Sequence, residues 1–158
     1  MRRLVYLLLA GLLVGADRLL KAWAAHSLVL GESRPLWGNA FHLTRMHNVG
    51  GAFGIFPGSG LLFLAVSSLV SVVLFILIVL GKPRGWFLRT GLAIVLAGAV
   101  GNLIDRLQFG YVLDFFEVRG FSIFNLADSC VTVGVAVILL HALFGGEKDR
   151  ASGTTDRL

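Results

Sequence analysis

The sequence has few of the residues that crosslink small domains or bind metal ions. It contains one cysteine, Cys130, in 158 residues, so an internal disulfide is excluded. Its four histidines show no ligand spacing, and no His-Glu-x-x-His zinc motif is present. The three prolines, Pro35, Pro57 and Pro83, all lie between the long apolar stretches. We therefore expect neither a metal nor any other cofactor, and no proline-kinked helix.

Charged residues are also scarce, and long apolar stretches take their place. Only 15% of the residues are charged, 56% are hydrophobic, and the mean hydropathy is +0.84. Leu61–Leu80 carries no charge, and about 20 apolar residues in a helix are enough to cross a bilayer. Trp86–Ile104 and Leu126–Phe144 carry little charge and have a similar length. These stretches predict an α-helical integral membrane protein.

The first segment, residues 4–25, is apolar until the charged stretch 17–21 interrupts it. A cleaved signal peptide is the alternative, but this charged stretch would connect poorly to a cleavage site. Gly11 and Gly15 form a small-xxx-small pair, which favours close packing against another span. We therefore count this segment as a span and predict four transmembrane helices.

Basic residues are concentrated at three places along the chain: the N-terminus, the second connection and the C-terminus. Because cytoplasmic loops are rich in Lys and Arg, we expect both termini to be cytoplasmic. The isoelectric point near 10.1 then reflects membrane topology, and we expect no nucleic-acid partner. The basic residues are Arg2, Arg3, Lys82, Arg84, Arg89, Lys148, Arg150 and Arg157.

The chain is predicted to form one membrane domain, residues 1–145, followed by a disordered cytoplasmic tail, residues 146–158. An outer insert, residues 26–60, interrupts the apolar pattern. Phe41–Thr44 alternates as a half-buried strand does, which predicts a small sheet on the membrane surface. Turns are expected at Gly50-Gly51 and Pro57-Gly58, and the aromatic residues that favour the headgroup region are Trp37, Phe41, Phe53 and Phe56.

Acidic and amide residues gather where the last two apolar stretches meet. Asn102 and Asp105 lie near the end of one stretch, Asp114 lies in the connection, and Asn125 and Asp128 begin the next. A carboxylate near the hydrocarbon costs roughly 2.5 to 3.5 kcal/mol, so such residues usually serve a function. The expected topology places all of them at the outer face of the membrane.

Some of these residues also have purely structural interpretations. Asp17 and Lys21 are four residues apart, as in an intrahelical ion pair. Asn125 and Asp128 have the spacing of a helix N-cap. Neither interpretation explains Asp114 in an apolar connection. Two carboxyls brought together there would share a proton and supply a general base and a general acid, as in aspartic proteases.

Other nucleophiles are poor candidates. Ser59 lies in Pro57–Gly60, which resembles part of an intramembrane serine protease motif but lacks its first glycine. Cys130 has no histidine near it in sequence, and a lone cysteine in an apolar stretch is usually a small core residue.

Five ordered blocks in nearly the whole chain resemble those of signal peptidase II, the bacterial lipoprotein signal peptidase family. One departure is Gly51, where the family commonly has Ala, and the loop between Asp114 and Asp128 is short. The blocks are Asp17-x-x-x-Lys21, Asn48–Phe53, Gly101–Arg106, Val112–Phe115 and Phe124–Ser129.

The resemblance implies four transmembrane helices and a small extracytoplasmic β-sheet cradle. It also implies catalytic residues Asp114 and Asp128 acting without a metal. Asp17 and Lys21 match a supporting pair. The positions that match substrate-holding or dyad-orienting residues are Asn48, Asn102, Asp105, Arg106 and Asn125.

The resemblance further implies a substrate and a location. The substrate would be a diacylglyceryl-modified prolipoprotein, cut on the amino side of its lipidated lipobox cysteine. The enzyme would lie in the bacterial cytoplasmic (cell inner) membrane, in contact with membrane lipid, with its active site on the outer side. We expect a monomer.

Two other classes of protein fit parts of the pattern. A small proton-coupled carrier would also contain intramembrane acids, but carriers usually bind near the midplane and often have internal repeats, which this sequence lacks. A non-catalytic scaffold would use the acids only as caps and ion pairs. Turnover of a lipidated prolipoprotein distinguishes the peptidase from both.

Overall fold

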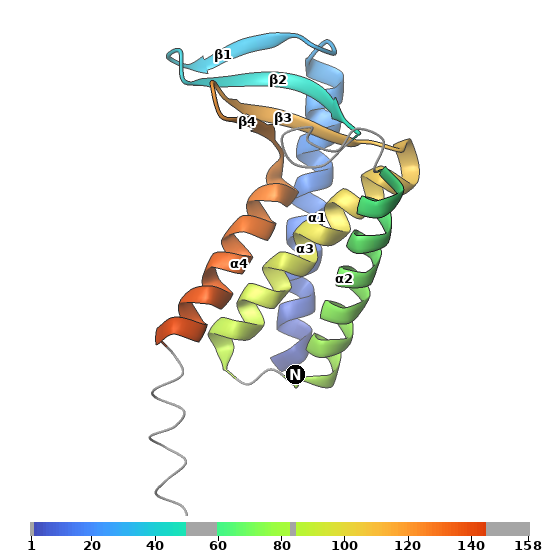
Figure 1. Ribbon diagram of the computed structural model, residues 1–158, viewed down its shortest axis with the longest axis vertical. Helices are drawn as coiled ribbons and strands as arrows, with labels where there is room; N and C mark the ends of the chain where they lie inside the picture. The colour runs from blue at the N-terminus through green and yellow to red at the C-terminus, as the bar shows by residue number, and fades with distance from the viewer. Residues whose placement is uncertain (1, 50–59, 83–84, 145–158) are drawn as a thin grey trace, which may run out of the picture.

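Four helices lie side by side, and a small sheet covers one end of the bundle (Figure 1). The computed structural model describes residues 2–49, 60–82 and 85–144. In chain order the elements are α1 (Arg2–Ser27), β1 (Ser33–Trp37), β2 (Phe41–Asn48), α2 (Gly60–Leu80), α3 (Trp86–Phe109), β3 (Val112–Val118), β4 (Ser122–Phe124) and α4 (Leu126–Phe144).

The four predicted helices are confirmed, but they are not equally apolar. Within the described part of the chain, α2, α3 and α4 are long and apolar enough to cross a membrane. α1 has 26 residues, or roughly 39 Å at 1.5 Å per residue, and it packs along α3. Its charged turn at 17–21 sets it apart, because Asp17 and Lys21 are almost fully buried in the bundle.

α3 is the central helix, and glycines allow α4 to approach it closely. In its most apolar stretch 56% of residues are buried, compared with 17% in α2 and in α4. A β-carbon on Gly91 would lie 3.1 Å from the carbonyl oxygen of Gly134, and one on Gly98 would overlap the carbonyl oxygen of Ala127. The prediction for Gly11 and Gly15 was wrong, since a β-carbon on either would meet no described atom within 4 Å. Small residues thus serve close packing in α3 and α4.

The sheet is antiparallel throughout, in the order β1-β2-β3-β4. The strand predicted at Phe41–Thr44 is present and continues to Asn48 as β2. The outer insert alone does not form the sheet, because the connection after α3 supplies β3 and β4. Residues 112–115 are all buried, so β3 lacks the alternation that reveals a half-exposed strand. Asp114 therefore lies on a central strand, where the sequence indicated a loop.

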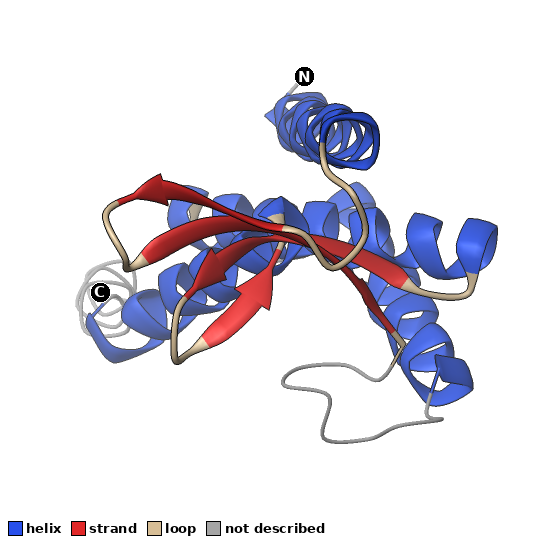
Figure 2. Ribbon diagram, turned by 90° about the horizontal axis from the view of Figure 1, so that it is seen from above, coloured by secondary structure: helices blue, strands red, loops and turns tan. Residues whose placement is uncertain are grey.

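Seen from above, the sheet lies across the ends of the helices, and α1 lies beside one of its faces (Figure 2). Ala24 and Leu28 at the end of α1 form a buried cluster with Leu113 and Phe115 of β3. This cluster fixes β3, and with it Asp114, above the bundle.

The predicted headgroup aromatics are only partly described. Trp37 and Phe41 flank the β1–β2 turn, with ring centroids 6.1 Å apart, and both are exposed. Their contact with headgroups stays a prediction. Phe53, Phe56 and the turns expected at Gly50-Gly51 and Pro57-Gly58 lie outside the described residues.

Candidate active site

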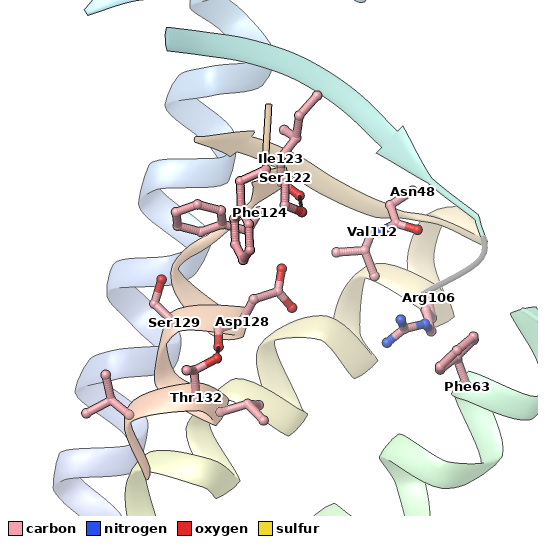
Figure 3. A pocket seen from close by; sticks show the side chains of 13 residues that line it. Asn48, Phe63, Arg106, Val112, Ser122, Ile123, Phe124, Asp128, Ser129 and Thr132 are labelled. Carbon is pink, nitrogen blue, oxygen red and sulfur yellow. Dashed lines mark hydrogen bonds between the residues drawn. The ribbon is translucent and has the colours of Figure 1, made fainter. Parts of the chain in front are cut away.

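A cavity of about 760 Å³ opens between the sheet and the upper ends of α2, α3 and α4 (Figure 3). Asn48, Arg106 and Asp128 line its polar part, and the Asp128 carboxyl and the Arg106 guanidinium both point into it. The hydroxyls of Ser129 and Thr132 donate to backbone carbonyls, which reduces their polarity toward the cavity. The other lining residues are Phe63, Val112, Phe121, Ser122, Ile123, Phe124, Val131 and Val133.

Asp114 projects from β3 and is buried, with 1% of its surface exposed. Asn48 Nδ2 donates to its Oδ2 at 3.0 Å, and Asn125 Nδ2 donates to its Oδ1 at 2.6 Å. Burial raises the pKa of Asp114 to about 7, and the charge of Asp128 adds to the rise. These hydrogen bonds lower that pKa but do not offset the burial. Asp114 thus readily holds a proton near neutral pH.

Asp128 occupies the first turn of α4. Its backbone N–H donates to Asn125 Oδ1 at 2.9 Å, and the Asn125 N–H donates to Asp128 Oδ2 at 3.2 Å. This reciprocal pair is a capping box, so the predicted N-cap is confirmed. Asn102 Nδ2 donates to Asp128 Oδ1 at 2.7 Å. The cap therefore coexists with a carboxyl that lines the cavity.

Two asparagines connect the carboxyls of Asp114 and Asp128. The Asn125 amide donates to Asn102 Oδ1 at 3.1 Å as well as to Asp114. Asn102 donates in turn to Asp128. The structure thus brings four predicted site residues into one network, although Asp114 is not among the residues that line the cavity.

Behind this network lies a buried cluster of charges. Lys21 Nζ forms ion pairs with Asp17 Oδ2 at 2.9 Å and with Asp105 Oδ2 at 2.8 Å, and it donates a hydrogen bond to Asn102 Oδ1 at 3.1 Å. The predicted Asp17–Lys21 ion pair is therefore confirmed, with two further acceptors. Asp17 also accepts a hydrogen bond from the Ala127 N–H at 3.0 Å, at the start of α4.

Among the described ion pairs, Asp105 binds Arg18 and Lys21 and not its sequence neighbour Arg106. Asp105 Oδ1 accepts a hydrogen bond from Arg18, and its Oδ2 forms the ion pair with Lys21. The same Oδ2 accepts a hydrogen bond from the backbone N–H of Leu113 at 3.1 Å. Successive helix residues point in different directions, which separates the two side chains. Arg106 donates to Ser67 Oγ at 3.3 Å, and its guanidinium lies 5.5 Å from the centre of the Phe63 ring. It thereby faces the cavity.

Sequence reasoning missed Arg18 as part of the site. The available signal was a basic residue at a depth where an unpaired charge is costly. The Asp17–Lys21 spacing already provided each of those residues with a partner, so it gave no reason to assign a role to Arg18. Among the described residues, no group of three or more His, Cys, Asp or Glu side chains is placed to hold a metal ion.

Comparisons with known proteins agree in the family they indicate. Residues 9–144 match the family model described as signal peptidase (SPase) II. A lipoprotein signal peptidase of Moorella thermoacetica is 40% identical over 146 residues, which cover 92% of this chain and 97% of the relative. That of Brevibacillus brevis is 41% identical over 150 residues, which cover 92% and 99%.

Solved structures agree with the fold. A bacterial membrane enzyme solved by the in meso method at 2.3 Å resolution superposes with a TM-score of 0.83 at 28% identity. The match covers 98% of this chain and 94% of that one. A second such structure, at 1.9 Å resolution, has a TM-score of 0.79 at 29% identity and covers 89% and 93%.

Proposed function

Because this chain belongs to the signal peptidase II family, we propose that Asp114 and Asp128 are the pair of carboxyls with which it cleaves its substrate. The protein is a lipoprotein signal peptidase, an aspartic peptidase, and a multi-pass membrane protein of bacteria. One observation carries the assignment of the pair. Asp128 faces a cavity, Asp114 is buried next to it, and Asn102 and Asn125 connect them.

The pair supplies a base and an acid for one hydrolytic step. The ionised carboxyl takes a proton from a water molecule, whose oxygen attacks the scissile carbonyl carbon. The protonated carboxyl donates its proton to the carbonyl oxygen. When the tetrahedral diol collapses, the C–N bond breaks and the amine leaves with the proton held by one carboxyl, while the other carboxyl takes a proton from a diol hydroxyl, which restores the pair. The two groups titrate together, so either one can begin as the base.

The surrounding side chains support this step by position. Asn48, Asn102 and Asn125 hold the carboxyls in place with neutral donors, which leave the shared proton on the pair. Arg106 lines the cavity and is placed to bind a peptide carbonyl of the substrate. Asp17, Lys21 and Asp105 support these groups from behind.

The cavity's composition supports the proposed substrate. Its polar part suits the peptide backbone around the scissile bond, and its apolar part suits lipid or the apolar signal segment. We assign to it a diacylglyceryl-modified prolipoprotein, cut on the amino side of the lipidated cysteine. A lipid-anchored cysteine holds that bond at the membrane surface, the depth assigned to the pair.

The proposed orientation has cytoplasmic termini and an outer active site. Arg3 and Arg89 lie at the end of the bundle opposite the sheet, where they donate to the carbonyls of Val79 and Gly81. This end therefore suits the cytoplasmic side, by the same charge rule applied to the sequence. We also propose that the enzyme is a monomer, and light scattering of the detergent-purified enzyme tests that state.

The test of the pair is a cleavage assay on a lipidated prolipoprotein in detergent, with a chelator present. We expect Asp114→Asn and Asp128→Asn each to lower turnover by roughly 10³-fold or more. The matched control is Glu32→Gln, which neutralises an acid outside the site. Full turnover by both site variants would refute the pair, and loss of wild-type activity with chelator would indicate a metal.

A further inference from the structure

Arg18 has no role in the step described above, yet it is bound to the buried charge cluster behind the pair. Its Nη1 donates to Asp105 Oδ1, and 27% of its side chain is exposed. Asp105 itself is fully buried, with 0% exposed, and Asp17 and Lys21 are each 1% exposed. Arg18 is thus the member of the cluster that reaches the surface.

The charges in this cluster balance only when Arg18 is counted. Asp17 and Asp105 are two carboxylates, and among the described residues Lys21 is the one fully buried cation that contacts both. Without Arg18, two carboxylates would compete for a single ammonium in a poorly hydrated site, where an uncompensated charge is costly. With Arg18 on Asp105 Oδ1, Lys21 also reaches Asn102.

This contact with Asn102 connects the cluster to the catalytic pair. Because Lys21 donates to Asn102 Oδ1, the amide nitrogen of Asn102 must face the other way, toward Asp128 Oδ1 at 2.7 Å. The same Asn102 oxygen accepts from Asn125, whose amide donates to Asp114. The orientation of the Asn102 amide therefore depends on Lys21. The Asn125 amide, in contrast, is also oriented by the Asp128 N–H that donates to its Oδ1.

We propose that Arg18 is a positioning residue for the peptidase reaction, which binds Asp105 so that Lys21 can hold Asn102 against Asp128. The proposal rests on the assignment of Asp114 and Asp128 as the catalytic pair. Asp105 Oδ2 also accepts the backbone N–H of Leu113, the residue before Asp114. Arg18 therefore supports both members of the pair, one through Lys21 and one through Asp105.

Loss of the Arg18 charge should change the chemistry as well as the stability. The Arg18→Gln variant leaves one excess negative charge beside the pair, so the pair should retain its proton to a higher pH. The charged groups around the pair are Asp17, Arg18 and Lys21 from α1, Asp105 and Arg106 from α3, Asp114 from β3 and Asp128 from α4. Only Arg18 changes in this variant.

The experiment measures kcat and KM against pH for wild type, Arg18→Gln and Arg18→Lys, with rates normalised to folded, monodisperse enzyme. We expect Arg18→Gln to lower kcat by about tenfold with little change in KM, as for other residues that orient a catalytic group. Its activity profile should move toward higher pH by roughly one unit, because of the added negative charge. Arg18→Lys should recover most of both effects. The control is Arg34→Gln, which removes an exposed arginine paired with Glu32.

A charge-balanced double variant provides the second test. Arg18→Gln with Asp105→Asn removes one charge of each sign, so Lys21 has only Asp17 as an ionic partner. We expect this variant to return to the wild-type pH profile, even if Arg18→Gln alone fails to fold. The readout is the position of the pH profile and not kcat, because Asp105 also supports the pair; a merely structural Arg18 would leave the profiles of the single and the double variant at the wild-type position.

The outcomes separate this proposal from the one on which it rests. If Arg18→Gln shows wild-type kcat and pH profile, or loses activity equally at all pH values, the positioning role is refuted. If Asp114→Asn and Asp128→Asn also remain active, the catalytic pair itself is wrong. Loss of activity in those two variants, together with an unaltered Arg18→Gln profile, would overturn only the role of Arg18.

Discussion

At the residue scale, the two carboxyls are held by neutral amide donors. Asn48 and Asn125 donate to Asp114, and Asn102 donates to Asp128. A cation in direct contact would favour two ionised carboxylates and so remove the shared proton. Arg18 and Lys21 are instead kept one residue away, where they bind Asp17, Asp105 and the oxygen of Asn102. This separation keeps the pair able to act as acid and base.

The raised pKa of Asp114 predicts a stability cost above neutral pH. Burial raises that pKa from its usual value of 3.8 to about 7, so between these values the folded state binds more protons than the unfolded state. Stability should therefore fall as pH rises from about 4 to 7, by as much as roughly 1.4 kcal/mol per unit. Unfolding of Asp114→Asn in detergent should show a smaller fall than that of wild type. Equal pH slopes in variant and wild type would contradict the prediction.

Asp17 should matter more for stability than for chemistry. Its carboxylate binds Lys21 and the N–H of Ala127, so Asp17→Asn leaves a buried cation with one acceptor fewer. We expect a loss of roughly 3 kcal/mol in the free energy of unfolding. Turnover per folded molecule should stay near wild type, because Lys21 still contacts Asp105 and Asn102. A stable, well-folded but inactive variant would refute this expectation.

At the element scale, the helices were easier to predict than the strands. Apolar stretches near 20 residues with little or no charge define α2, α3 and α4 directly, because a bilayer imposes that length. β3 is buried along its first four residues, and β4 has only three residues, so neither shows a period of two. Their pairing with β2 is a long-range contact that no local pattern reveals.

For the site, the sequence predicted most of the residues but not their mutual contacts. Asn102, Asp105, Asp114, Asn125 and Asp128 were noticeable because polar groups in apolar stretches are costly. Which of them bind each other depends on how three helices and a strand pack. That dependence explains why the sequence did not reveal that Arg18 from α1 binds Asp105.

The close contact between α3 and α4 predicts a sensitive glycine. A β-carbon on Gly98 would overlap the carbonyl of Ala127 and lie 2.7 Å from Val131 Cγ2. Gly98→Ala should therefore push the start of α4 away from α3, lengthen the Asn102–Asp128 hydrogen bond, and cost roughly 1 to 3 kcal/mol of stability.

Thermal unfolding and turnover of the purified variant measure these two effects. Gly11→Ala is the matched control, because no described atom lies within 4 Å of its added methyl group and alanine favours a helix. The packing explanation is wrong if Gly98→Ala and Gly11→Ala unfold at the same temperature.

At the scale of the whole molecule, the bundle and the sheet meet where the polar residues lie. α1, α3 and α4 each bring polar side chains to the sheet end, and β3 adds Asp114 from above. A polar network on lipid-facing helices would leave groups unsatisfied, so the sheet and the inner helix faces must cover it. The sheet and these helix faces leave the network accessible at the cavity beside Asp128.

This arrangement predicts which end of the molecule reagents can reach from outside the cell. In a Cys130→Ser background, Arg34→Cys on β1 should react with a membrane-impermeant maleimide in intact spheroplasts. Lys82→Cys, in the connection between α2 and α3, should react only after permeabilisation, because positive loops stay in the cytoplasm. Native Cys130 is 6% exposed and should stay unlabelled in the folded protein, which provides the background control. Labelling of Lys82→Cys in intact spheroplasts would show the opposite orientation. The active site would then face the cytoplasm, where it could not remove signal peptides at the outer surface.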